Sequence, residues 1–166
     1  MAYPTEAVYG LGCDPRNQIS VGQLLALKGR AKSKGLILIA SSYEQLEPYL
    51  APVEEKVLER CLATWPGPVT WILPANPDVP FWLTGGRDTL AVRVTAHSLS
   101  SALCRVVGHP LVSTSANLSG HRPLKGPLAI RRIFGKKIRL VLHGALGGAN
   151  CPTAIRDART GATLRS

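Results

Sequence analysis

The residues best suited to bind a ligand lie in one short polar stretch that follows the apolar residues 110–112. It carries hydroxyl groups at Ser113, Thr114 and Ser115 and an amide at Asn117. This order predicts a buried strand that opens into a polar loop, which is where open α/β sheets bind ligands. Hydroxyl, amide and backbone N–H groups so close together suit a phosphorylated or sugar-bearing ligand. The alternative is a serine- and asparagine-rich turn that only ends the strand.

A second candidate group consists of four cations within seven residues, Lys28, Arg30, Lys32 and Lys34. They precede the continuous apolar run 36–40, so we expect them at a junction between a helix and a central strand. Lysine and arginine side chains on a loop beside a sheet can bind a triphosphate. The alternative is a helix C-terminus that collects cations because of its dipole.

The charge of the chain is distributed unevenly. The net charge is +10, and the residues between Thr89 and Arg156 include no aspartate or glutamate but ten lysines and arginines. The polar stretch lies in this basic half, so we expect an anionic partner or substrate, either nucleotide phosphates, nucleic acid or both. The alternative is a solvated basic face that serves solubility.

The elements that position these groups alternate between helices and strands. A capping box at Ser20 and Gln23 predicts a helix that ends near residues 28–30. We expect further helices over 42–50, 53–64, 98–107 and 128–134, strands over 1–3, 36–40, 69–73, 90–94, 110–112 and 138–142, and a hairpin near 160–161. The pattern predicts an α/β fold with one domain over 1–166, whose open sheet is twisted, mixed or parallel, and flanked by helices.

Several classes of protein are excluded or disfavoured. An apolar run of about 18 residues is missing, so no membrane span is expected. The sequence has no Walker A loop and no G-x-S-x-G motif. No histidine and aspartate that could form a catalytic triad with Ser113 or Ser115 are evident, which disfavours a nucleophilic serine. The four cysteines are scattered, which predicts reduced thiols in a cytoplasmic protein. No metal-ligand cluster is present, so any Mg²⁺ is expected to arrive on the phosphates of the substrate.

Four motifs in this order resemble the YrdC/Sua5/TsaC family of threonylcarbamoyl-AMP synthases, in the short form of its bacterial TsaC branch. They are 4–12 (PTEAVYGLG), Lys28-x-Arg30 with 34–36 (KGL), 65–70 (WPGPVT) and 113–120 (STSANLSG). The match covers nearly the whole chain, including 93–95 (RVT) and 155–157 (IRD).

The resemblance implies a twisted α/β sheet around a basic cavity, and a reaction that joins L-threonine, bicarbonate and ATP into L-threonylcarbamoyladenylate with release of pyrophosphate. This product leads to N6-threonylcarbamoyladenosine at position 37 of tRNA, through downstream transfer proteins. The implied catalytic residues are Lys28 and Arg30. Nucleotide binding is implied for Lys34, Ser113, Ser115, Asn117 and Arg156, and substrate binding for Thr5, Ala7, Thr70, Arg93 and Thr153. Arg93 and Arg156 are expected to face phosphates.

The sequence departs from the family pattern at a few places. Ala31 stands where a proline is usual, Ala7 replaces a common threonine, and 152–154 reads Pro-Thr-Ala where Pro-Ser-Thr is frequent. We also expect a helix and part of the first strand of the family to be missing before Pro4. Two alternatives to the synthase stay open. One is a module that binds double-stranded RNA or tRNA without this catalysis, and the other is a degraded synthase that binds ATP but turns over poorly.

Overall fold

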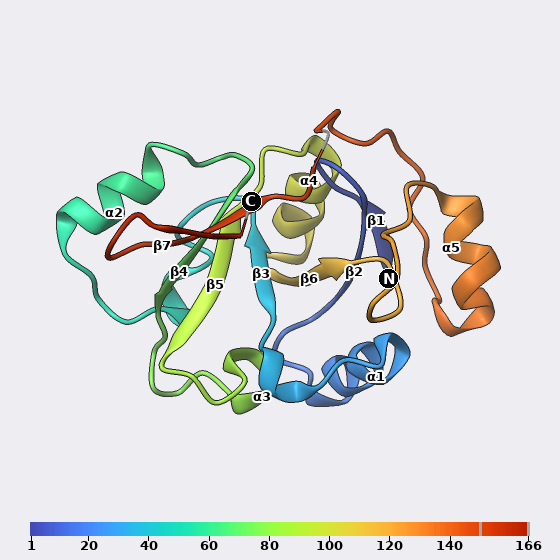
Figure 1. The fold of residues 1–166 in the computed structure, drawn as a ribbon, viewed down its shortest axis with the longest axis horizontal. Helices are drawn as coiled ribbons and strands as arrows, with labels where there is room; N and C mark the ends of the chain where they lie inside the picture. Colours follow the sequence, from blue (N-terminus) through green and yellow to red (C-terminus); the bar gives the residue numbers. More distant parts are fainter. Residues whose placement is uncertain (150, 166) are drawn as a thin grey trace.

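A single mixed sheet runs through the centre of the molecule (Figure 1). The computed structural model describes residues 1–149 and 151–165. The described strands follow the order β1-β2-β6-β3-β5-β4-β7-β8 across the sheet. Their bounds are β1 Ala2–Pro4, β2 Tyr9–Cys13, β3 Ile37–Ala40, β4 Val69–Pro74, β5 Thr89–Val94, β6 Leu111–Ser115, β7 Ala154–Asp157 and β8 Thr163–Arg165. The predicted open, mixed α/β sheet is therefore confirmed.

Antiparallel pairs dominate this sheet, and only β3–β5 and β4–β7 are parallel among the described strands. The prediction that a loop opens at Ser113 is wrong, because β6 continues to Ser115. Ser113 pairs with Gly12 of β2 on one side and with Ile37 of β3 on the other. Backbone hydrogen bonds to β2 on one side and to β3 on the other keep these hydroxyl residues in an extended conformation, although serine has a weak preference for strands. The polar loop begins only at Ala116.

The helices lie around the sheet, with α4 packed against β1 and β3 and α1 against β2 (Figure 1). Their bounds are α1 Gln18–Lys28, α2 Glu55–Leu62, α3 Phe81–Thr84, α4 Ser98–Val107 and α5 Pro127–Phe134. The capping box predicted at Ser20 is wrong. Asn17 caps α1 instead, since its side chain accepts a hydrogen bond of 2.9 Å from Ser20 N. Gly29 ends α1 with a φ of 59°, in the left-handed region that favours glycine.

Two predicted elements are absent from the described residues. The helix expected over 42–50 is a set of bends with a 3₁₀ turn at Glu47–Tyr49. The Gln45 side chain accepts from Ser41 N and donates to Cys104 O instead of supporting a helix. The segment expected to form a strand over 138–142 makes only an isolated bridge, from Val141 to Ala2. It diverges from β1 after this one pair of residues.

The alternation of side chains along β3 divides the core between the two faces of the sheet. Ile37 and Ile39 pack with residues of α4, whereas Leu38 and Ala40 belong to the larger cluster on the other face. Trp65 and Trp71 are buried in that larger cluster. Residues of β5 and β6, among them Arg93 and Ser113, line a cavity.

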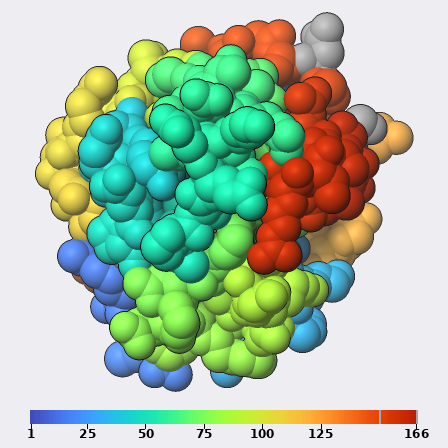
Figure 2. Space-filling model, turned by 90° about the vertical axis from the view of Figure 1, so that its left-hand side faces the viewer, coloured from blue at the N-terminus to red at the C-terminus, as the bar shows by residue number. Residues whose placement is uncertain are grey.

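The predicted C-terminal hairpin is confirmed as β7 and β8, which pair antiparallel. Figure 2 shows the C-terminal segment, in red, lying beside the green residues around α2 and β4. Arg60 of α2 binds the loop between β7 and β8, because its Nη1 donates to Ala158 O at 2.6 Å and to Arg159 O at 2.8 Å. The parallel pairing of β7 with β4 sets the position of the hairpin, and Pro152 and Thr153, just before β7, line the cavity described below.

The described residues contain no helix that is long and apolar enough to cross a bilayer. The four cysteines are free. Burial raises the pKa of the Cys13 and Cys104 thiols to about 11 and that of Cys61 to about 12, so these three thiols are held in the protonated form at neutral pH.

Candidate functional site

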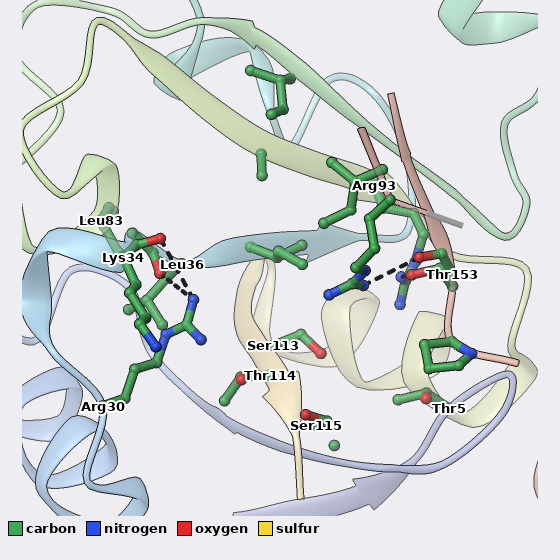
Figure 3. Close-up of a pocket in the computed structure, with 18 of the residues that line it drawn as sticks. Thr5, Arg30, Lys34, Leu36, Leu83, Arg93, Ser113, Thr114, Ser115 and Thr153 are labelled. Carbon is green, nitrogen blue, oxygen red and sulfur yellow. Dashed lines mark hydrogen bonds between the residues drawn. The ribbon is translucent and has the colours of Figure 1, made fainter. Parts of the chain in front are cut away.

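A cavity of about 520 Å³ lies over β6, β3 and β5. Ser113, Thr114 and Ser115 lie between its two sides (Figure 3), so β6 brings the predicted hydroxyl groups to the cavity. Gly10 of the neighbouring β2 keeps this region open. A Cβ atom there would lie 3.2 Å from Thr5 Cγ2 and 3.4 Å from Ser113 Oγ. The cavity therefore depends on a small residue in β2 as well as on the polar stretch.

One side of the cavity is cationic. It holds Arg30 and Lys34 from the turn before β3 and Arg87 from the turn before β5. Figure 3 shows Arg30 and Lys34 together on this side, across from Arg93. Arg165 of β8 also lines the cavity, and its Nη2 donates to Thr153 O at 3.2 Å, next to Arg93. Arg30 Nη2 donates to Gly35 O at 2.9 Å, while its buried Nε has no partner among the described residues. Burial, with Arg165 and Arg87 nearby, lowers the pKa of Arg30. The described lining includes no aspartate or glutamate.

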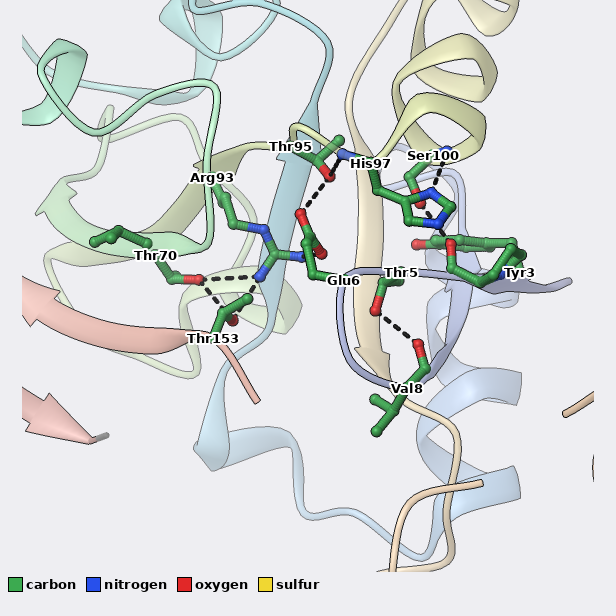
Figure 4. Close-up of polar contacts among 12 residues, drawn as sticks. Tyr3, Thr5, Glu6, Val8, Thr70, Arg93, Thr95, His97, Ser100 and Thr153 are labelled. Atoms are coloured by element: carbon green, nitrogen blue, oxygen red, sulfur yellow. Dashed lines mark hydrogen bonds and ion pairs between the residues drawn. The ribbon is translucent and has the colours of Figure 1, made fainter. Parts of the chain in front are cut away.

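The opposite side of the cavity holds a second arginine in a network of hydrogen bonds (Figure 4). Arg93 Nη1 donates to Thr153 Oγ1 at 2.6 Å and to Thr70 Oγ1 at 3.4 Å. Its Nη2 lies 3.2 Å from Glu6 Oε2. Arg93 is 5 % exposed, and its Nε has no partner among the described residues. Burial lowers the pKa of Arg93, and the Glu6 carboxylate acts in the opposite direction.

Lys28 and Asn117 come together beside the cavity rather than in its lining. Lys28 Nζ donates to Asn117 O at 2.8 Å, to Asn117 Oδ1 at 3.1 Å, and to Ser115 O. Ser115 Oγ also donates to Asn117 Oδ1 at 2.6 Å. Burial, with Arg30 nearby, lowers the pKa of Lys28 to about 8. This cluster fixes the turn that follows β6.

The structure brings most of the residues implied by the resemblance to one cavity. Its lining includes Thr5, Ala7, Arg30, Lys34, Arg93, Ser113, Ser115 and Thr153. The other four implied residues, Lys28, Thr70, Asn117 and Arg156, do not line it. Thr70 is fully buried behind Arg93, and the Arg156 guanidinium carbon lies 5.8 Å from the Trp71 ring centroid. The binding and catalytic roles of all twelve remain predictions.

Sequence reasoning missed Arg87 and Arg165 as lining residues. Arg165 lies on a C-terminal strand that reaches the cavity only through the pairing of β8 with β7. A signal for Arg87 existed in the preceding Gly85-Gly86 pair, which marks a tight turn. A Cβ atom at Gly85 would lie 2.6 Å from Gly35 N, so this glycine lets the Arg87 turn approach the Lys34 turn. Among the described residues, no group of three or more His, Cys, Asp or Glu side chains could hold a metal ion.

Comparisons with known proteins identify the relatives of this chain. The Sua5/YciO/YrdC family model, described as "Telomere recombination", matches residues 1–166. The chain is 57% identical over 165 residues to a threonylcarbamoyl-AMP synthase of Halorhodospira halophila, covering 99% of this chain and 86% of that protein. A synthase of the same name from Nitrosococcus oceani is 54% identical over 165 residues, with 99% and 89% covered.

A solved structure of P. abyssi Sua5 complexed with L-threonine has the same fold. It superposes with a TM-score of 0.87 at 33% identity, and the match covers 94% of this chain and 46% of that longer chain. The present chain thus spans about half the length of that protein. Because the family model spans the chain and relatives above 50% identity cover nearly all of it, this chain belongs to the Sua5/YciO/YrdC family.

Proposed function

We propose that this protein is an L-threonylcarbamoyladenylate synthase, which uses L-threonine, bicarbonate and ATP and releases pyrophosphate. The observation that carries the proposal is the cavity with a cationic side and, opposite it, Arg93 held by Glu6. An enzyme of this kind must hold a triphosphate and an amino acid at the same time, with their reacting atoms close together. Relatives at 54–57% identity that carry the synthase name support the same assignment.

The reaction follows from the chemistry of the three substrates. The threonine amine attacks the carbon of bicarbonate or of the CO₂ derived from it, so that a C–N bond forms and, from bicarbonate, water leaves. A carbamate oxygen then attacks the α-phosphorus of ATP, and the bond from that phosphorus to the bridging oxygen breaks as pyrophosphate leaves. Both reactants are anions, and Arg30, Lys34 and Arg87 offset their repulsion and the charge that grows on pyrophosphate.

Different residues of the cavity bind the nucleotide and the amino acid. The hydroxyl groups of Ser113 and Ser115 donate to the nucleotide without adding charge, and Thr5, Arg93 and Thr153 hold the amino acid. The carbamate is short-lived, so a cavity that keeps it next to the α-phosphate contributes much of the rate acceleration. Lys28 and Asn117 act from outside the lining by fixing the turn after β6.

The remaining partners follow from this reaction. Mg²⁺ enters as part of the MgATP substrate, with the phosphates and water as its ligands. The product passes to proteins that transfer the threonylcarbamoyl group to tRNA in the cytoplasm. RNA affinity accompanies the basic surface but does not replace the catalysis. An RNA-binding module without catalysis is not favoured, because close relatives are named as synthases.

A pyrophosphate-release assay tests the proposal directly. We expect release that requires ATP, L-threonine and bicarbonate together, with little release when L-serine replaces L-threonine. Arg30→Ala and Arg87→Ala are each expected to reduce kcat/KM for ATP at least tenfold, whereas Lys32→Ala, an exposed cation outside the lining, leaves it within twofold. Release that continues without threonine would refute the assignment. RNA affinity that falls steeply with salt, in a protein without turnover, would instead favour the RNA-binding module.

A further inference from the structure

Glu6 is a buried carboxylate to which neither the family resemblance nor the proposed reaction assigns a binding or catalytic role. It lies in the turn between β1 and β2, is 7 % exposed, and does not line the cavity. Its two oxygens have separate partners. Oε2 faces Arg93 Nη2 at 3.2 Å, and Oε1 accepts from Thr95 Oγ1 at 2.6 Å (Figure 4). A buried carboxylate with both oxygens committed to fixed donors has a single stable orientation.

The backbone around Glu6 is fixed as tightly as its side chain. Ala149 N donates to Glu6 O at 3.0 Å, and Gly147 N donates to Thr5 O at 3.1 Å. A Cβ atom at Gly147 would lie 3.0 Å from Glu6 Cα, so the segment 147–149 runs directly against this turn. Thr95 is held in turn, because its Oγ1 accepts from His97 N at 3.2 Å. Glu6 is therefore a rigid support for Arg93.

This support determines which part of the Arg93 guanidinium group remains available. A guanidinium has five N–H donors in a planar fork. Thr70 and Thr153 accept from Nη1, and Glu6 accepts from Nη2. The Nε–H is buried and lacks a partner among the described residues, and one of the two N–H groups of Nη2 is also uncommitted in a side chain that lines the cavity. A buried donor without a partner is costly, and a ligand oxygen that accepts from it removes that cost.

Glu6 also makes the two sides of the cavity electrostatically different. Arg30, Lys34 and Arg87 have no carboxylate beside them in the described lining, whereas the charge of Arg93 is compensated by a carboxylate at 3.2 Å. Arg165, which donates to Thr153 O, adds one further cation next to Arg93. A polyphosphate gains most from several uncompensated cations, while a single carboxylate needs only a well-oriented pair of N–H donors. Compensation at Arg93 therefore disfavours phosphate there.

We propose that Glu6 is a positioning residue, which orients and partly neutralises Arg93 so that this side of the cavity accepts the carboxylate of the amino-acid substrate in preference to phosphate. The inference rests on the proposed function, because that function supplies the amino acid and the triphosphate that must be separated. Glu6 touches neither substrate in this arrangement and acts only through Arg93. It extends the proposed function by naming the group that keeps the two substrates apart.

Calorimetry on the full chain tests the proposal with Glu6→Gln, which keeps the shape of the side chain and removes its charge. We expect the Kd for L-threonine to rise at least tenfold and the Kd for MgATP to change less than threefold. Inorganic phosphate is expected to compete with threonine at least fivefold more strongly than in the wild type. Glu44→Gln, at an exposed glutamate, should leave all three values within twofold.

A double-mutant cycle with Arg93→Gln separates positioning from general structural damage. If Glu6 acts through Arg93, adding Glu6→Gln to Arg93→Gln lowers threonine affinity by less than a further twofold. Losses that multiply would overturn the proposal, as would a threonine Kd within twofold of wild type in Glu6→Gln.

Two further measurements keep the proposal testable. If Glu6→Gln does not fold, Thr95→Val removes the hydroxyl that holds Glu6 and should weaken threonine binding at least threefold, and Thr95→Ser should restore it. Unchanged threonine affinity in Thr95→Val would overturn the proposal. A wild-type chain that binds no L-threonine would overturn both the proposed function and this inference. Normal wild-type turnover with unchanged threonine affinity in Glu6→Gln would overturn the positioning role alone.

Discussion

Replacing Lys28 with methionine removes a buried ammonium group and keeps the length of the side chain. Lys28 is 3 % exposed, and its Nζ donates to three oxygens of the turn after β6, namely Ser115 O, Asn117 O and Asn117 Oδ1. The three protons of the ammonium match these three acceptors. In the variant, Asn117 Oδ1 keeps the hydrogen bond from Ser115 Oγ at 2.6 Å. The turn after β6 loses its side-chain hydrogen bonds to Lys28, the last residue of α1.

The expected loss of stability follows from two opposing effects. Hydrogen bonds to a charged group contribute about 1.5–3 kcal/mol each, so three contribute roughly 4.5–9 kcal/mol. Against this, burial lowers the pKa of Lys28 from its ordinary value of 10.5 to about 8. That shift corresponds to a cost of roughly 3 kcal/mol for keeping the ion in the folded protein. The variant should therefore lower the free energy of unfolding by about 1–6 kcal/mol.

Urea unfolding at pH 7 measures this change, with Lys32→Met as the matched control, since Lys32 is an exposed lysine in the next turn. We also expect the Kd for MgATP to rise several-fold in Lys28→Met, because the turn that carries Asn117 loosens. A free energy of unfolding within about 0.5 kcal/mol of wild type would refute the reasoning, since surface substitutions alone produce changes of that size. In that case the three bonds would contribute nothing beyond the cost of burying the charge.

The other predictions concern pH, packing and the substrate. Between about pH 7.5 and 9.5 the unfolded chain binds more protons at Lys28 than the folded chain, because the pKa of Lys28 in the folded protein is about 8. Over this range the free energy of unfolding of wild type should therefore rise by about 2 kcal/mol relative to that of Lys28→Met. A constant difference between the two proteins in parallel urea titrations would contradict this. Gly12→Ala should destabilise by more than about 3 kcal/mol in urea unfolding, because the new Cβ would lie 2.6 Å from Val112 O. Gly22→Ala, in the middle of α1 with open space around its Cβ, should stabilise by about 0.5–1 kcal/mol, and equal effects of the two glycine variants would count against the packing argument. Thr153→Val removes an acceptor at 2.6 Å from the buried guanidinium and should raise KM for L-threonine at least fivefold with little change in KM for ATP, whereas a rise confined to ATP would place the substrates the other way round.

Local pattern was sufficient for much of the fold. The apolar runs near 36–40, 69–73 and 90–94 formed strands, and the helix over 98–107 ended at Gly108 as predicted. These elements depend on the periodicity of side chains and on glycine at helix ends, and both can be read from neighbouring residues. Local pattern failed at Ser113 and at 138–142, where the number of neighbouring strands decided whether the backbone stayed extended.

The candidate site shows the same division more sharply. The sequence alone determined which residue types were present: a polar stretch, a group of cations before a strand, and an arginine, Arg93, inside a predicted strand. Only the tertiary structure decided which groups meet. Glu6 and Arg93 pair across 87 residues of chain, and Arg165 enters the cavity through the pairing of the last two strands. Lys28 turned away from the lining toward three backbone and side-chain oxygens, because a buried ammonium is bound by the acceptors nearest to it. Charge and hydrogen bonding act over a few ångströms in space, whatever the separation along the chain, so the partners of each group became known only once the sheet had been assembled.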